Sequence, residues 1–181
     1  RHWQQQLDQQ PKYMTVVSKP TQADLPILIR GNHQMPSSIA PRAFLSAVSV
    51  PSVASIPAGA DGRLALARWI AAEENPLTAR VYVNRLWAWL MGTGLVTTTN
   101  EFGTMGAMPT HPELLDWLAA EFHQSGGSTK HIVRLIVTST AYQRRVESTP
   151  QLATMDPDNR LYARGHRRRL SAESLRDQML R

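Results

Sequence analysis

Two helix boundary signals that enclose residues 75–92 constrain the fold of this 181-residue chain more than any other feature. Asn75 followed by Pro76 supplies a helix cap and a first-turn proline, and Gly92 is a stop signal. The residues between them are apolar nearly all round: Val81, Val83, Leu86, Trp87, Trp89 and Leu90. Because such a helix is typical of the centre of a protein, we predict a central helix that runs to about Met91.

Further helices are predicted on both sides. Upstream, a helix begins at Asp61 and turns one face to the core, with Leu64, Ala67, Ile70 and Ala71. Downstream, Thr110 to Glu113 matches a capping box, so a third helix starts there and ends at Gly126-Gly127. Ser128 caps a fourth helix with the apolar residues Ile132, Val133, Leu135, Ile136 and Tyr142. Residues 147–165 are turn-rich, and Ser171 caps a last helix, 172–181.

The first 60 residues hold seven of the twelve prolines, which disfavours regular helix there. Met14 to Ser18 and Leu25 to Arg30 favour a small β-hairpin, and Gly31-Asn32 is a turn signal after the second run. The rest, His33 to Ala60, is predicted as an extended strap over the helices. The fold class is therefore mainly α: an antiparallel, bundle-like helical domain at 61–181 and a proline-rich extension at 1–60, together one structural unit.

The charge distribution is uneven. Residues 1–125 hold nine basic and nine acidic side chains, whereas residues 126–181 hold eleven and five, so the net charge of +6 lies in the last third. Seventeen of the twenty basic residues are arginine, which suits carboxylate, sulfate or phosphate groups, although a GC-rich genome gives the same bias. The absence of cysteine excludes disulfides, thiolate metal sites and covalently attached c-type haem. No run of apolar residues is long enough to predict a membrane span.

A cationic run near the end of the chain is a candidate site for an acidic or sulfated polymer: Arg164, His166, Arg167, Arg168 and Arg169. These side chains could instead pair with acidic neighbours such as Asp158 and Glu173. A nucleic-acid site is the other alternative, because Lys130, Arg134 and Thr138 align on the predicted fourth helix. That reading requires these residues and the arginine run to share one exposed face.

Two more polar clusters are candidates. His111, Glu113 and Asp116 could form a catalytic or metal-binding group, but the capping box already gives Glu113 a structural role. Arg80, Asn84 and Arg85 lie on the central helix, where buried polar groups need partners. We interpret them, together with Asp116, as a structural polar network, with an anionic ligand as the alternative. No metal site is predicted.

Several sequence pieces, in this order and spacing, resemble one family: Arg63 to Trp69, Glu74 to Arg80, Val83 to Trp87, Gly92 to Val96, Pro109 to Ala119, Asp156 to Leu161 and Arg167 to Glu173. The family is the C-terminal domain of unknown function of large planctomycete proteins that often also carry planctomycete-type cytochrome c domains. The resemblance implies a mainly helical domain of an exported protein, in the periplasm or cell envelope, near polysaccharide or sulfate-ester breakdown. It implies no catalytic residue.

The sequence thus favours a non-catalytic structural or interaction module of an exported, cytochrome-linked protein. Its expected partners are neighbouring domains of the same polypeptide and acidic or sulfated polysaccharide. No cofactor is expected in this segment, and haem would belong to other domains. Because the chain starts at Arg1 without a signal-peptide pattern, we expect it to be a piece of a longer product. The alternatives are a polysaccharide-acting enzyme domain that uses the His111 cluster and a basic nucleic-acid-binding domain.

Overall fold

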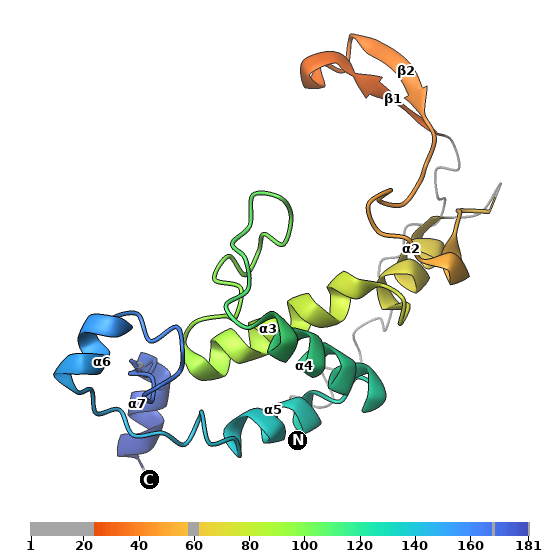
Figure 1. The fold of residues 1–181 in the computed structure, drawn as a ribbon. Coiled ribbons are helices and arrows are strands. Elements are labelled where there is room, and N and C mark those ends of the chain that lie inside the picture. The colour runs from red at the N-terminus through yellow and green to blue at the C-terminus, as the bar shows by residue number, and fades with distance from the viewer. Residues whose placement is uncertain (1–23, 58–61, 168, 181) are drawn as a thin grey trace, which may run out of the picture. The chain divides into compact units, whose positions relative to one another are not determined.

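The computed structural model describes residues 24–57, 62–167 and 169–180. Within them the chain is mainly helical and has one small antiparallel sheet of two strands, which confirms these two parts of the predicted fold class (Figure 1). The chain divides into two compact units, Arg1–Trp69 and Ile70–Arg181, and the boundary in the sequence falls within a helix, Gly62–Ala71. Among the described helices, none has the length and apolar character needed to cross a membrane.

The hairpin in the first unit consists of β1 (Leu25–Leu28) and β2 (Pro36–Ala40). A short 3-10 turn, η1 (Ile29–Gly31), follows β1, and Gly31 takes a φ of 75°, which glycine adopts without strain. The partner that we predicted for β1, Met14 to Ser18, lies outside the described residues. The segment predicted as a strap, His33 to Ala60, supplies the observed partner strand, β2.

The first helix, α2 (Gly62–Ala71), turns a different face to the core than we predicted. Its buried residues are Ala65 and Trp69, whereas Leu64 is 60% exposed and Ile70 is 44% exposed. The Trp69 ring stacks on Phe44, with ring centroids 5.5 Å apart. This aromatic contact with the proline-rich segment, which also forms the short helix η2 (Pro51–Val53), selects the buried face. The predicted cap, residue 61, lies outside the described residues.

The central helix, α3 (Pro76–Met91), has the predicted boundaries. The Asn75 side chain accepts a hydrogen bond from the Leu77 amide at 3.0 Å, and Gly92 ends the helix with a φ of 89°. Helix α3 packs against two further helices, α4 (Pro112–Gln124) and α5 (Thr129–Val137) (Figure 1). It is less buried than predicted, because Trp89 is 69% exposed. Its buried side chains recur every three or four residues and meet the α4 and α5 core: Ala79, Val83, Asn84, Trp87 and Met91.

The start of α4 differs from the prediction. Thr110 and Glu113 form no capping box: the helix begins after His111 without a side-chain cap, and the Thr110 hydroxyl donates to the Leu95 carbonyl oxygen at 3.3 Å. The Thr110 hydroxyl, which would cap the helix, is bound instead to the Leu95 carbonyl oxygen of the loop after α3. The Gly126-Gly127 turn has the left-handed backbone that the sequence indicates.

The later helices follow their cap signals. Ser128 accepts from the His131 amide and starts α5, which ends at Val137, so Tyr142 lies beyond this helix. Ser171 caps α7 (Ala172–Met179) as predicted. A short helix, α6 (Pro150–Met155), occupies part of the segment 147–165, which we predicted as turn-rich.

Candidate functional site

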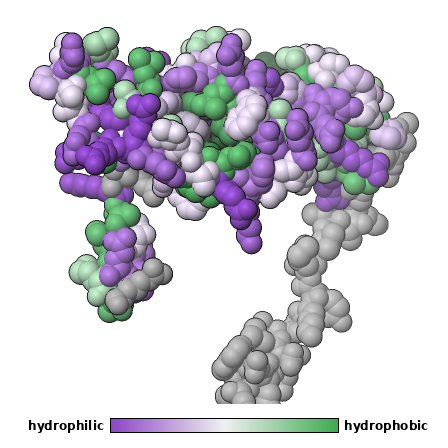
Figure 2. Space-filling model, turned by 60° about the horizontal axis from the view of Figure 1, so that its bottom comes forward, coloured by the Kyte–Doolittle hydropathy of each residue, from purple (hydrophilic) through white to green (hydrophobic). Residues whose placement is uncertain are grey.

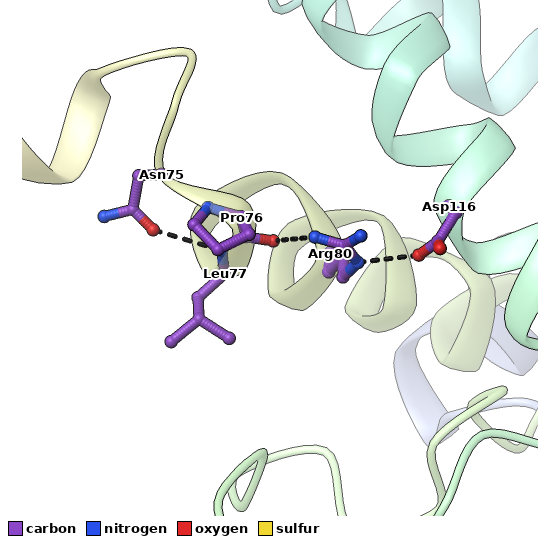
Figure 3. Close-up of polar contacts among 5 residues, drawn as sticks. All are labelled: Asn75, Pro76, Leu77, Arg80 and Asp116. Atoms are coloured by element: carbon purple, nitrogen blue, oxygen red, sulfur yellow. Dashed lines mark hydrogen bonds and ion pairs between the residues drawn. The ribbon is translucent and has the colours of Figure 1, made fainter. Parts of the chain in front are cut away.

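The predicted cluster of His111, Glu113 and Asp116 does not come together as one group of side chains. Arg80 Nε donates to Asp116 Oδ1 at 2.7 Å, and Arg80 Nη1 donates to the Pro76 carbonyl oxygen at 2.7 Å (Figure 3). His111 instead lies 3.0 Å from the Thr110 hydroxyl through its Nδ1 atom. Glu113 is exposed and has no hydrogen bond or ion pair to any described residue. Within the part of the chain that the structure describes, no three His, Asp or Glu side chains could together hold a metal ion.

Both hydrogen bonds of the Asn84 side chain go to one residue of the loop after α3, Val96. Its Nδ2 atom donates to the Val96 carbonyl oxygen at 3.0 Å, and its Oδ1 atom accepts from the Val96 amide at 2.9 Å. The Asn84 side chain has no exposed surface, so both bonds lie in the core. A Cβ atom on Gly94 would lie 2.5 Å from the Val96 oxygen, which explains why glycine stands there. We call this arrangement the Asn84 clasp.

Arg85 also contacts the loop after α3, where its Nη2 atom donates to Asn100 Oδ1 at 3.2 Å. The polar residues proposed as one network therefore make separate contacts. Arg80 pairs with Asp116, whereas Asn84 and Arg85 bind different residues of the loop.

The segment that leads to the cationic run is held by its own polar side chains. Asp156 accepts hydrogen bonds from the amides of Arg160 and Leu161, both at 2.8 Å. The Leu161 amide, followed by the Arg160 amide and the nearby guanidinium groups, holds the pKa of Asp156 below its ordinary value. Asn159, which has a φ of 53°, exchanges two hydrogen bonds with the backbone of Arg164.

Arg164 has a structural role in this segment. Its guanidinium donates to the Pro157 carbonyl oxygen at 2.6 Å and lies within 3.5 Å of two more oxygens, on Leu152 and Ser148. Arg144 likewise donates to the Ala163 carbonyl oxygen at 3.0 Å. Two arginines of the basic third are thus bound to protein oxygens, which reduces what they can offer a ligand.

Tyr162 joins the segment to the core. Its hydroxyl accepts a 2.9 Å hydrogen bond from Trp87 Nε1, and the two rings meet edge to face at 5.2 Å. Burial raises the pKa of the Tyr162 hydroxyl. The rings of His111 and His166 lie 5.4 and 5.6 Å from the Tyr162 ring. Tyr162 has a φ of 53°, which is rare for an aromatic residue and costs of order 1–3 kcal/mol.

His166 lies where three surface hollows meet. The first hollow, about 320 Å³, also has Arg164, Arg167 and Asp158 in its wall. A second, about 270 Å³, includes Arg144 and Leu90. The third, about 570 Å³ and widely open, is lined by Val146, His166, Arg167 and Arg169. Figure 2 shows hydrophilic side chains gathered at the left end, where Figure 1 places α6.

The Nε2 atom of His166 is buried and has no hydrogen-bond partner among the described residues. Burial, assisted by the positive charge of Arg164, lowers the pKa of His166. Of the predicted cationic run, the structure therefore brings Arg164, His166, Arg167 and Arg169 to shared hollows, and residue 168 lies outside the described residues. Sequence reasoning missed Tyr162 and Arg144. The only signal near Tyr162 is the turn composition of residues 156–159.

The residues proposed for nucleic-acid binding do not all lie on one helix. Lys130 and Arg134 are exposed on α5, but Thr138 follows the end of that helix, where its hydroxyl donates to the Arg134 carbonyl oxygen at 2.7 Å. Helix α5 therefore has only these two basic side chains, Lys130 and Arg134, to place in the groove of a nucleic acid, and its other residues are largely apolar.

The helices and their polar contacts define a mainly helical domain. Several side chains that the sequence singles out bind the protein's own backbone: Arg80, Asn84, Thr138 and Arg164. The family model described as "Protein of unknown function (DUF1553)", named PSD1, matches residues 62–181, and the chain belongs to this family. No curated protein and no solved structure matches the chain significantly.

Proposed function

We propose that the chain is a non-catalytic structural or interaction module of a larger exported, cytochrome-linked protein that takes part in polysaccharide breakdown. The observation that carries the proposal is the fate of the only acid and histidine cluster singled out in the sequence. Asp116 is bound by Arg80, and His111 contacts Tyr162 and Thr110. Glu113 forms no hydrogen bond or ion pair with His111 or Asp116. Membership of a family of unknown function is compatible with this role.

The chemistry of glycoside hydrolysis supports this choice over the enzyme alternative. That reaction uses two carboxyl groups on either side of one bond, about 5–10 Å apart, and one of them must deliver a proton. Asp116 instead faces a guanidinium at 2.7 Å. Its Oδ1 atom is thus already bound within the protein by Arg80 Nε.

The remaining polar groups of the core also serve the fold. The Asn84 clasp fixes the loop after α3, and Tyr162 fixes the segment around α6. A rigid core of this type is suited to presenting a constant surface to neighbouring domains. In the proposed protein, haem and redox chemistry belong to those neighbours, and location in the periplasm or cell envelope follows from the same family resemblance.

The experiment has two arms. The purified chain is incubated with neutral, acidic and sulfated polysaccharides, and reducing ends are measured. Separately, its binding to the neighbouring domains of the same polypeptide is measured by calorimetry. We expect no turnover and saturable binding. Turnover that is lost in Glu113→Gln but kept in the matched exposed variant Glu101→Gln would overturn the proposal. A stoichiometric metal ion, found by elemental analysis of protein purified without added metal, would also overturn it.

A further inference from the structure

The strongest unexplained feature is the open hollow lined by Val146, His166, Arg167 and Arg169. Arg167 and Arg169 are exposed and make no hydrogen bond or ion pair with any described residue. They differ in this respect from Arg164 and Arg144, whose guanidinium groups are bound to carbonyl oxygens. The hollow is therefore lined by two guanidinium groups that bind no described residue of the protein.

His166 adds a third polar group to the wall. No described residue forms a hydrogen bond with its buried Nε2 atom, and leaving a buried polar atom unpaired is unfavourable. A fold keeps such a group where another interaction compensates for it. His166 is one of the four residues that line this hollow, so the unpaired group belongs to a side chain of its wall.

The charges around His166 favour an anion in this hollow over the adjacent hollow of about 320 Å³. Asp158 lines the adjacent hollow of about 320 Å³, and its carboxylate would repel an anion there. No acidic residue lines the hollow of about 570 Å³ among the described residues, and the charged groups on its wall are Arg167 and Arg169. Arg164 also lines the first hollow, and its positive charge acts on His166.

The number of donors indicates the kind of anion. A single arginine fork saturates the two oxygens of a carboxylate. Here three side chains, at positions 166, 167 and 169, border one space, and a tetrahedral group with three or four oxygens can accept from all of them. We propose that this hollow is a binding site for a sulfate or phosphate group. This deepens the proposed interaction function and rests on it, because it names the chemistry that the module recognises.

The test measures binding of sodium sulfate, sodium phosphate, glucose 6-sulfate and unmodified glucose to the 181-residue chain by NMR, at constant ionic strength set with chloride. The signals of His166 and of the arginine Nε–H groups report the site. We expect saturable shifts with sulfate and phosphate and none with glucose. Arg167→Gln/Arg169→Gln should weaken binding about tenfold or more, because two charge-assisted hydrogen bonds are lost.

Arg134→Gln/Arg145→Gln is the matched control, since it removes the same charge from two exposed arginines outside this hollow. An equal loss of affinity in both double variants would reduce the effect to general charge and overturn the proposal, as would unchanged binding in Arg167→Gln/Arg169→Gln. Tighter binding of glucose 6-sulfate than of sulfate identifies an ester on a larger molecule as the source, and equal binding identifies the free ion. If the chain binds its neighbouring domains but does not bind sulfate or phosphate in this hollow, only this inference is refuted. If the chain turns over a polysaccharide, only the non-catalytic function is refuted.

Discussion

Replacement of Asn84 tests how the core is held together. Asn84→Ala removes both hydrogen bonds to Val96 and leaves the amide and carbonyl of that buried residue without partners. Each unpaired buried group costs about 1–3 kcal/mol, so we expect a loss of about 2–6 kcal/mol in the free energy of unfolding. This is a large part of the roughly 5–15 kcal/mol that typical domains have.

Asn84→Asp makes the same reasoning depend on pH. The ionised carboxylate still accepts from the Val96 amide, but it faces the Val96 carbonyl oxygen and is buried, so at pH 7 we expect it to cost at least as much as alanine. The protonated form can donate to that carbonyl as asparagine does. The folded-state pKa of this aspartate is therefore raised above its unfolded value of about 3.9. Its stability is recovered as pH falls through the raised folded-state pKa and is lost as pH rises through it.

Urea unfolding followed by circular dichroism at pH 7 and pH 4.5 gives the required differences. The difference between Asn84→Asp and the original chain should shrink at pH 4.5, whereas the difference for Asn84→Ala should stay constant. Using differences from the original chain removes the effect of other titrating groups such as Asp156. A loss below about 1 kcal/mol in Asn84→Ala, or a parallel pH response of both variants, would show that the clasp does not stabilise the fold as argued.

Three further predictions concern single contacts. Gly94→Ala places a Cβ atom 2.5 Å from the Val96 carbonyl oxygen, and we expect a loss of about 1–3 kcal/mol in urea unfolding; a change within error would contradict the close approach. Tyr162→Phe leaves the buried Trp87 N–H without its acceptor, so we expect a loss of about 1–3 kcal/mol and a changed tryptophan emission maximum, and an unchanged spectrum would refute the contact. Because the pKa of His166 is lowered in the fold from 6.5, the thermal midpoint should fall as pH drops below that value; His166→Gln should flatten this dependence, and an equally steep curve would exclude His166 as its source.

Much of the helical part could be predicted from the sequence because local chemistry decides it. Asn75, Ser128 and Ser171 each accept a hydrogen bond from an amide two or three residues ahead, and Gly92 takes the left-handed backbone after α3. These contacts involve neighbours in the chain, so the spacing of residue types contains the needed information.

The errors arose where a distant residue competes with a local one. Thr110 lies in a valid capping-box pattern, but its hydroxyl binds the Leu95 carbonyl oxygen fifteen residues earlier. Likewise, Phe44 stacks on Trp69 and sets the buried face of α2, which periodicity within that helix does not reveal. Neither contact leaves a pattern in the sequence.

The candidate site could be predicted only in part. The arginine run is visible in the sequence, yet the structure divides it into Arg164, which binds carbonyl oxygens, and Arg167 and Arg169, which do not. Tyr162 could not be identified because its position depends on a left-handed backbone that no side chain with a Cβ atom prefers. The need of Asn84 for a partner was predictable, but Val96, twelve residues later, was not.

The Asn84 clasp restricts where this domain can change length. One residue added between Asn84 and the end of α3 would turn the asparagine by about 100° and move it by about 1.5 Å relative to the loop that it holds. Both hydrogen bonds to Val96 would then be lost together. Relatives that keep this clasp should therefore carry their insertions and deletions before Asn84 or after Val96, and the stretch between these two residues should keep one fixed length.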